Sequence, residues 1–431
     1  MKITGIIAEY NPFHNGHLYQ IQKIRKETDT DYIIVVLSGD FVQRGEPAII
    51  DKYARTKMAL SCGADLVVEL PALWACSSAE TFAAAGVALL DLTGCVDTLC
   101  FGAEHADLSL LSRLADVLVD EPASYKKALS DSLKAGKSFP AARMQALLSY
   151  FSENAALLPE ASEKKDVVVS DTISTILSSP NNILAVEYLK ALKLRNSSIC
   201  PYVIRRAGAG YHDDDIHAPN ASATAIRQVL HSGSDLSCTL SAAMPHAAAD
   251  ILEDYLSASC TVTADDFSAV LNYLLLLYPA EQLCRFADCN ASIANRLKKN
   301  LTSFSSYTQF ANLNKSRDIT YTRMSRIFSH ILLQITDDDY CIAKELDYVP
   351  YIRPLGFRKE SAPLLSKIKK NCSVPLLGKT ANAGKELNDR ALKVFEKDVF
   401  AADLYEQVKA KKSGGICQSE YTRQIVVWGE I

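Results

Sequence analysis

Residues 3–17, which read ITGIIAEYNPFHNGH, decide the fold of this chain. The first part, residues 3–8, is mostly apolar and β-branched, which is typical of a strand buried inside a parallel sheet. A turn follows, and from Asn15 to Lys26 the apolar residues recur at helical spacing. A buried strand, a turn and an amphipathic helix in this order predict the first repeat of an α/β fold.

Strand and helix patterns keep alternating up to residue 102. Short β-branched runs predict further strands at Tyr32–Ser38, Asp65–Glu69 and Thr98–Gly102. Between them, helical spacing predicts helices at Tyr53–Cys62 and Ser77–Leu92. This alternation indicates a Rossmann-like α/β domain with a parallel, doubly wound sheet.

The rest of the chain is dominated by helical patterns. We expect a helical insertion at about 105–165, and then a strand at Cys200–Arg205 and a helix from Ala223 that complete an ATP-binding domain over residues 1–232. From residue 233 to 431 helical spacing prevails, which predicts a second, mainly α-helical domain. Its helices are expected at 245–256, 265–277, 291–301, 321–336 and 385–408.

Composition limits the classes of protein that fit this sequence. The 431 residues are 48% apolar and 22% charged with a net charge of −4, so any nucleic-acid site must be a local basic patch. The 12 cysteines are scattered without a C-x-x-C pair, as in a reducing compartment. No signal sequence and no apolar run of about 20 residues is present. We expect a cytoplasmic protein with no membrane partner.

The turn between the first strand and helix carries the pattern His14-x-Gly16-His17. A helix start exposes free N–H groups and the positive end of a dipole, which bind phosphate. Gly16 permits close approach, and two imidazoles three residues apart can lie on one face of the first helical turn. There they can stabilise the charge that develops as pyrophosphate leaves. The alternatives are zinc ligands or ordinary turn residues.

A second pattern, Ser222-Ala-Thr-Ala-Ile-Arg227, also opens a predicted helix. Ser222 or Thr224 can cap that helix, and the Arg227 guanidinium can donate two hydrogen bonds to phosphate oxygens. An ordinary helix cap followed by an exposed arginine explains the same residues. The two patterns together resemble the two signatures of the HxGH nucleotidyltransferase superfamily, which enclose one nucleoside triphosphate from both sides.

Longer segments narrow the resemblance to one family. Four of them, at 5–17, 38–47, 179–184 and 205–212, are similar to segments of the bacterial tRNA(Met) cytidine acetate ligases. The resemblance implies an enzyme that uses ATP and acetate to acetylate N4 of the wobble cytidine of elongator tRNA(Met). Ala207 departs from the family pattern, where a larger aliphatic residue is expected.

The resemblance also implies a set of ATP contacts. They fall on Ile7, Ala8, Glu9, Tyr10, Asn11, Pro12, Phe13, His14, Asn15, Gly16, His17, Leu18, Tyr19, Gln20, Gly102, Asn181 and Arg206. The second signature adds Ser222, Thr224 and Arg227. Gly102 ends a predicted strand at the edge where open sheets bind ligands, and the Asn181 amide can bind an adenine or ribose edge.

Charged residues follow the second predicted strand. Asp40 can bind Mg2+, which we expect to accompany ATP, or accept a proton from an attacking amine. Arg44 and Lys52 can hold phosphate or tRNA, and a solvated loop is the alternative for all three. The catalytic residues expected are therefore His14, His17 and Asp40, whereas the residues that would hold a metal ion are not indicated by the sequence.

Residues 290–330 are basic in an otherwise acidic chain. The basic residues predicted to bind tRNA are Arg296, Lys298, Lys299, Lys315, Arg317, Arg323 and Arg326. Aromatic residues lie between them and can stack on unpaired bases: Phe304, Tyr307, Phe310, Tyr321 and Phe328. The alternative is that the aromatic residues form a helical core and the charges form a solvated face.

Three functions remain open from the sequence. The first is a ligase that forms acetyl-adenylate and transfers the acetyl group to tRNA. The second is a nucleotidyltransferase that adenylylates a small phosphorylated substrate, which would leave the basic segment without a use. The third is a non-catalytic RNA-binding protein that senses ATP, which the histidines and arginine at the phosphate site oppose. The oligomeric state is not indicated.

Overall fold

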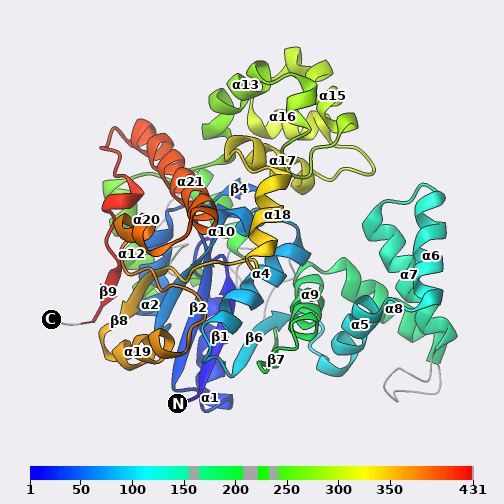
Figure 1. The fold of residues 1–431 in the computed structure, drawn as a ribbon, viewed down its shortest axis with the longest axis horizontal. Helices are drawn as coiled ribbons and strands as arrows, with labels where there is room; N and C mark the ends of the chain where they lie inside the picture. The colour runs from blue at the N-terminus through cyan, green and yellow to red at the C-terminus, as the bar shows by residue number, and fades with distance from the viewer. Residues whose placement is uncertain (155–164, 207–221, 233–239, 241, 430–431) are drawn as a thin grey trace. The chain divides into compact units, whose positions relative to one another are not determined.

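The computed structural model describes residues 1–154, 165–206, 222–232, 240 and 242–429. The chain divides into two compact units (Figure 1). The larger unit comprises Met1–Asp97 and Gly208–Ile431, and the smaller unit comprises Thr98–Ala207.

The larger unit contains the predicted parallel sheet. Strands β1 (Ile3–Ala8), β2 (Tyr32–Ser38) and β5 (Leu66–Leu70) lie side by side in that order and are parallel. Residues 33–37 of β2 are fully buried, as expected for a strand covered on both faces. The sequence-based prediction of an α/β fold with a parallel sheet is confirmed.

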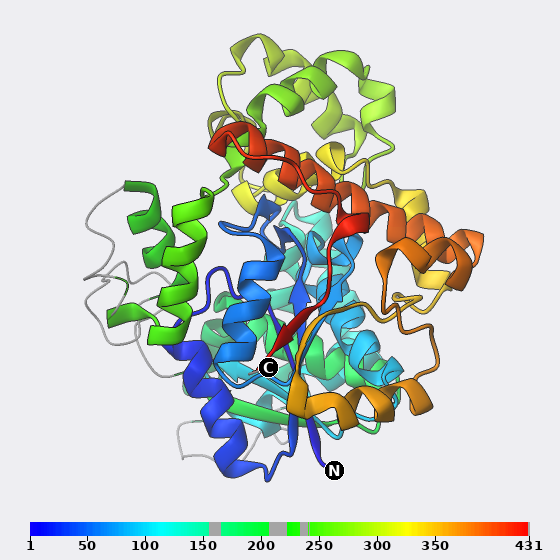
Figure 2. The same ribbon diagram turned by 90° about the vertical axis from the view of Figure 1, so that its left-hand side faces the viewer.

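Two strands from the C-terminal half extend this sheet. β8 (Pro354–Arg358) pairs antiparallel with β5, and β9 (Val426–Trp428) pairs parallel with β8. Figures 1 and 2 show the chain after α21 (Asp389–Ser413) returning to the sheet to form β9. Neither strand was predicted, because both are short and their pairing partners are distant in sequence.

Helices α1 (Asn15–Glu27), α2 (Lys52–Ser61), α3 (Ala72–Ala75) and α4 (Ala79–Leu92) connect the parallel strands. Side-chain caps define the N-terminal ends of α2 and α4. The Asp51 carboxylate accepts the backbone N–H of Ala54 at 2.9 Å, and Ser78 caps α4 in the same way through Thr81. A two-stranded hairpin, β3 (Phe41–Val42) with β4 (Glu46–Pro47), lies between β2 and α2.

The remaining part of the larger unit is mainly helical, as predicted. The helices that the structure describes there are α10 (Ala223–Ser232), α12 (His246–Ala258), α13 (Ser268–Leu277), α14 (Ala280–Leu283), α15 (Ala291–Asn300), α16 (Tyr307–Asn314), α17 (Tyr321–Leu332), α18 (Asp337–Glu345), α19 (Ala362–Asn371), α20 (Ala383–Glu386) and α21. Helices α13, α15, α16 and α17 gather at one end of this unit (Figure 1). None of the helices in the described part of the chain is both long and apolar enough to cross a membrane.

The smaller unit has its own strands and helices. β6 (Thr98–Ala103) and β7 (Cys200–Arg205) form a parallel pair. Its helices are α5 (Leu108–Asp120), α6 (Ala123–Lys134), α7 (Phe139–Glu153), α8 (Lys165–Ser178) and α9 (Pro180–Leu194). Helix α5 packs against α9, and α6 packs against α7.

The compact units do not coincide with the expected division at residue 232. The expected insertion at about 105–165 lies within the smaller unit, which extends further on both sides. The C-terminal half shares a unit with residues 1–97, because β8 pairs with β5 and buried charges of the C-terminal chain contact α2. Such contacts join residues several hundred positions apart, which local periodicity does not reveal.

Candidate active site

The turn after β1 is held by aromatic packing. Tyr10 has a positive φ of 45°, a conformation that costs a non-glycine residue about 1–2 kcal/mol. Its buried ring lies 4.8 Å from the ring centre of Phe13 and 4.7 Å from that of His17. The Asn11–Pro12 peptide bond is cis. These contacts fix the path of the chain from β1 into α1.

His14 and His17 open α1 as a pair. The Nδ1 atom of His14 accepts the backbone N–H of Gly16 at 3.0 Å, and the Nδ1 atom of His17 accepts the backbone N–H of His14 at 3.2 Å. The rings stack with their centres 3.7 Å apart, so the prediction that they lie on one face is confirmed. Because each Nδ1 accepts, the proton of each neutral ring is on Nε2, where it can be donated to an anion.

Gly16 is required by the position of the His14 ring. A Cβ atom at Gly16 would lie 2.9 Å from Cε1 of His14, closer than such atoms approach in proteins. A larger residue would therefore displace the ring that caps the helix. The zinc alternative gains no support, since the described residues contain no group of three His, Cys, Asp or Glu side chains placed to hold a metal ion.

The second sequence signature lies beside the first. The hydroxyl of Ser222 accepts the backbone N–H of Ala225 at 3.1 Å, which confirms the predicted helix cap. Arg227 donates from Nη1 to the carbonyl of Asn11 at 2.8 Å and from Nη2 to the hydroxyl of Thr224 at 3.1 Å. Burial and the nearby Arg44 lower the pKa of the Arg227 guanidinium. The two signatures are thus joined by a hydrogen bond.

Of the charged residues after β2, Asp40 and Lys52 are buried, whereas Arg44 is half-buried. The Oδ1 atom of Asp40 accepts the backbone N–H of Lys52 at 2.8 Å, and burial, opposed by the charge of Lys52, raises the pKa of Asp40 to about 7. The Nζ atom of Lys52 lies 2.7 Å from a carboxylate oxygen of Glu69 and 2.8 Å from one of Glu420. The expectation that Lys52 holds phosphate or tRNA is therefore wrong, because its charge is satisfied inside the protein.

No role was predicted for Arg55, yet its side chain forms hydrogen bonds that connect the ends of β1 and β2. Its buried guanidinium donates to the carbonyls of Glu9 at 2.8 Å, Ser38 at 2.9 Å and Ile50 at 3.1 Å, and also to that of Gly39. Four backbone acceptors on three segments hold the strand ends that carry the turn. A single arginine on a helix gives no sequence signal of such a role.

Three residues implied by the family resemblance lie together in the smaller unit. Asn181 at the start of α9 donates to Glu104 at 2.6 Å and accepts from Arg206 at 3.4 Å. A Cβ atom at Gly102 would lie 3.2 Å from Cγ of Arg206. The side chain of Arg206 is exposed. Glu104 was not predicted, and the part of the motif at residues 207–212 lies outside the described residues.

The aromatic residues of the basic segment form a helical core. The rings of Tyr307, Phe310 and Phe328 are buried, with Phe310 stacked on Phe328 at 5.8 Å between ring centres. Phe304 packs on Phe310, and the hydroxyl of Tyr321 donates to Glu46. The expectation that these rings stack on RNA bases is wrong for the three buried ones, because they fill the space between α16 and α17.

The basic residues of this segment divide into two groups. Lys298 donates to the carbonyls of Leu275 and Tyr278 at the end of α13, Arg296 donates to that of Asn314, and Arg326 lies 4.0 Å from the Asp288 carboxylate. Arg323 is half-buried, whereas Lys299, Lys315 and Arg317 are exposed. A role for these residues in binding tRNA stays a prediction, and it depends most on the exposed three.

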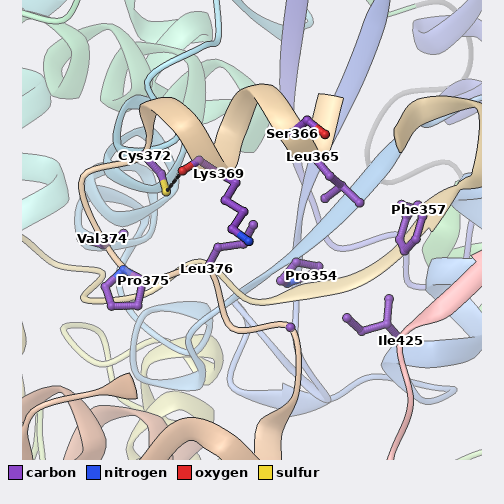
Figure 3. A pocket seen from close by; sticks show the side chains of 11 residues that line it. Pro354, Phe357, Leu365, Ser366, Lys369, Cys372, Val374, Pro375, Leu376 and Ile425 are labelled. Carbon is purple, nitrogen blue, oxygen red and sulfur yellow. Dashed lines mark hydrogen bonds between the residues drawn. The ribbon is translucent and has the colours of Figure 1, made fainter. Parts of the chain in front are cut away.

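A cavity of about 510 Å³ lies at another place in the larger unit. Figure 3 shows side chains from β8, α19 and the loop after α19 pointing into it. Its lining is apolar except for Ser366, Lys369 and Cys372, and the Cys372 thiol contacts the carbonyl of Lys369. It shares no residue with the His14 turn and presents one cation among apolar groups, which does not suit a nucleoside triphosphate.

Comparison with known proteins identifies the family. Residues 1–419 match the family described as HIGH Nucleotidyl Transferase. The tRNA(Met) cytidine acetate ligase of Acetivibrio thermocellus is 39% identical over 430 residues, which cover 99% of this chain and 100% of that protein. The corresponding protein of a Thermoanaerobacter species is also 39% identical, with the same coverage.

Solved structures agree with the sequence comparison. The crystal structure of Thermotoga maritima TmcAL bound with alpha-thio ATP matches with a TM-score of 0.88 and 29% identity, covering 99% of both chains. The apo form of the same protein matches with a TM-score of 0.90. This chain therefore belongs to the HIGH nucleotidyl transferase family and, within it, to the family of tRNA(Met) cytidine acetate ligases.

Proposed function

We propose that this chain is an ATP-dependent ligase that acetylates N4 of the wobble cytidine of elongator tRNA(Met). The observation that carries the proposal is the pair of stacked histidines at the start of α1, joined to Arg227 through the carbonyl of Asn11. This arrangement gathers N–H donors at one turn, which suits the triphosphate of ATP. The relatives' names supply the class of reaction and the RNA.

We propose the ATP-binding residues that the family resemblance implies, and this arrangement supports several of them. Residues 7–20 span the end of β1, the turn and the first half of α1, so their backbone and the two imidazoles surround one helix start. Arg227 adds a guanidinium, and Ser222 and Thr224 hold the start of its helix and its Nη2. Gly102, Asn181 and Arg206 remain part of the proposed ATP site on the strength of the family resemblance.

The proposed reaction has two steps. A carboxylate oxygen of acetate attacks the α-phosphorus of ATP, the bond from that phosphorus to the leaving oxygen breaks, and pyrophosphate departs with the electron pair. The N4 amine of cytidine then attacks the carbonyl carbon of acetyl-adenylate, the carbon–oxygen bond to AMP breaks, and N4 loses one proton. In the first step His14 and His17 stabilise negative charge from Nε2, and positioning supplies the rest.

Magnesium is expected to enter with ATP, since Mg2+ is usually bound through substrate phosphates and one or two carboxylates. Asp40 does not suit the role of a carboxylate ligand to Mg2+, because its carboxylate is buried and faces Lys52 and Arg55. We assign no protein ligand to the metal ion. The cytoplasm is the proposed location, because tRNA and ATP occur there together.

The test is mass spectrometry of nucleosides from bulk tRNA incubated with the protein, ATP and isotopically labelled acetate. The expected product is labelled N4-acetylcytidine in elongator tRNA(Met), with pyrophosphate and AMP released in equal amounts. Pyrophosphate release that requires a small phosphorylated substrate instead of acetate would show a nucleotidyltransferase. No pyrophosphate release under any of these conditions would rule out both enzymes.

A further inference from the structure

A second cavity, of about 340 Å³, opens directly beside the His14 turn. Asn11 of the turn lines it together with Arg227. The other walls come from the β3–β4 hairpin, α10, residues 262–265 and α16. Its volume is at the lower end of the roughly 300–1,000 Å³ that small-ligand sites occupy, which suits a single nucleoside better than a folded segment.

The walls of the cavity combine flat apolar surface with hydrogen-bonding groups of both kinds. Pro47, Ile49 and Val262 are buried and apolar. Acceptors come from the carboxylates of Glu46 and Asp265, and donors come from Arg227 and His231. Two carboxylates on the walls disfavour acetate or phosphate as the occupant and favour a neutral ligand with an amine.

Glu46 is positioned firmly but keeps acceptor capacity. Its Oε1 atom accepts the hydroxyl of Tyr321 at 3.1 Å. The preceding carbonyl of Gly45 accepts hydroxyl hydrogen bonds from Tyr307 and Ser325 at 2.7 Å and 2.6 Å. A carboxylate has about four acceptor sites, so most of those on Glu46 remain for a ligand.

Cytosine carries the complementary groups on one edge. Its exocyclic amine donates two hydrogen bonds, and a glutamate or aspartate is the side chain that commonly accepts from it. Its ring nitrogen and carbonyl oxygen accept, which matches the guanidinium and imidazole donors. We propose that this cavity binds the cytosine base of the RNA substrate, with Glu46 accepting a hydrogen bond from the N4 amine. The assignment rests on the proposed function.

The position of the cavity fits that task. Asn11 lines the cavity and its carbonyl accepts from Arg227, so a bound base lies next to the turn at which ATP is proposed to react. Enzymes that modify a base must take it out of the stack, which costs least in a single-stranded loop. Helix α16 contributes Thr308 to the cavity and ends next to the exposed Lys315, so the cavity and the basic surface share one helix.

The proposal predicts discrimination between cytidine and uridine. Uracil has a carbonyl oxygen where cytosine has the amine, and that oxygen would face the Glu46 carboxylate. In Glu46→Gln, the side-chain oxygen can still accept from Tyr321, so the fold is retained, while the amide can donate to uracil. Glu281, an exposed residue of α14, gives a matched control in Glu281→Gln, which removes the same charge from a residue that does not line the cavity.

The experiment measures three quantities on the full-length parent and both variants. They are acetate-dependent ATP–pyrophosphate exchange without tRNA, acetylation of a transcript with cytidine at the wobble position, and competition by the same transcript with uridine there. For Glu46→Gln we expect exchange within about threefold of the parent, acetylation reduced at least tenfold, and tighter competition by the uridine transcript. Glu281→Gln should match the parent in all three.

The outcomes separate the two hypotheses. If the parent acetylates its transcript and Glu46→Gln acetylates equally well, the cavity does not bind the base, although the proposed function stands. An equal loss of exchange and acetylation in Glu46→Gln would place Glu46 at the adenylation step and also overturn the assignment. A parent that performs neither reaction would refute the proposed function and, with it, the role of the cavity.

Discussion

At the scale of single residues, His14 has two tasks that the sequence pattern did not separate. Its Nδ1 atom caps α1, while its Nε2 atom is the proposed donor to phosphate. The motif could be predicted from the sequence, because a strand, a glycine turn and a helix start all leave local signals. The tautomer of each imidazole could not be predicted, since it depends on which backbone N–H group each ring accepts.

The substitution His14→Asn separates the cap from the chemistry. The asparagine oxygen can still accept the N–H of Gly16, whereas the donor at Nε2 is lost. We expect the free energy of unfolding to change by less than about 1 kcal/mol. Turnover should fall roughly 100-fold or more, as when one donor to a developing anion is removed.

Urea unfolding and steady-state rates test this pair of expectations. Ser78→Ala is the control, because it removes the cap of α4 without touching the turn. It should lower stability by about 1 kcal/mol and leave turnover unchanged. A near-normal rate in His14→Asn would remove this ring from the catalytic site.

Asp40 gives a prediction of pH dependence. Its pKa is raised from 3.8 to about 7 in the folded protein by burial, so the folded state holds the proton more tightly than the unfolded state. Its contribution to stability is therefore complete below about pH 4 and is lost as the pH rises through 7. Asp40→Asn does not titrate and should lack this loss.

Unfolding free energies of the parent and of Asp40→Asn at about pH 5 and pH 8 provide the measurement. From pH 5 to pH 8, the free energy of unfolding of the parent should fall by roughly 2–3 kcal/mol relative to that of Asp40→Asn. Other groups, such as Asp398 with its similarly raised pKa, titrate in both proteins and cancel. A constant difference would show that Asp40 ionises normally. If turnover of the variant also stays normal, Asp40 has no catalytic role.

At the scale of elements, helices and buried strands with strong local patterns were predicted to within a few residues. β1 and β2 were predicted with the observed bounds, and α1 differs by one residue. The short strands β8 and β9 and the β3–β4 hairpin were missed, because long-range contacts stabilise them. The hairpin is the clearest case, since its Gly45 carbonyl accepts three hydroxyl groups from α16 and α17.

The substitution Gly45→Ala should disrupt the packing of the β3–β4 hairpin against α17. Gly45 has a φ of 74°, and a Cβ atom there would lie 2.3 Å from the backbone nitrogen of Arg326 in α17. The residue therefore faces both an unfavourable conformation and a collision with a helix backbone. We expect the free energy of unfolding to fall by more than about 2 kcal/mol, as measured in urea.

Gly414 provides the matched control for this substitution. It has a φ of 72°, and no atom lies within 4 Å of the position that a Cβ atom would take. Gly414→Ala should cost only the conformational part, about 1 kcal/mol. Equal losses in the two variants would mean that the hairpin is not locked against α17.

At the scale of the whole molecule, the prediction of a tRNA-binding surface depends on which basic side chains are exposed and which are paired inside the protein. The net charge of −4 hides an exposed basic group at Lys299, Lys315 and Arg317. Sequence alone could not separate these from Lys298, whose ammonium group donates to two carbonyls of the protein. It also could not show that Lys52 is buried against Glu69 and Glu420, since Glu420 approaches only through the folded C-terminal chain.

Charge reversal at the exposed group tests the tRNA surface. In the triple variant Lys299→Glu, Lys315→Glu and Arg317→Glu, fewer cations meet the RNA backbone, so fewer counterions are released on binding. The affinity for elongator tRNA(Met) should fall, and its dependence on salt should become shallower by about one unit of logarithmic slope per lost phosphate contact. Acetate-dependent ATP–pyrophosphate exchange without tRNA should persist, because its reactants are bound at the His14 turn.

The control reverses three exposed lysines elsewhere in the helical region, at Lys344, Lys385 and Lys393, and changes the net charge equally. If long-range attraction by the whole molecule dominated, both triple variants would lose the same affinity and the slope would not distinguish them. If the basic group contacts phosphates directly, only the first variant changes its slope. Unchanged affinity and slope in the first variant would make the group a solvated face, and loss of exchange with the fold intact would contradict the separation of ATP and tRNA surfaces.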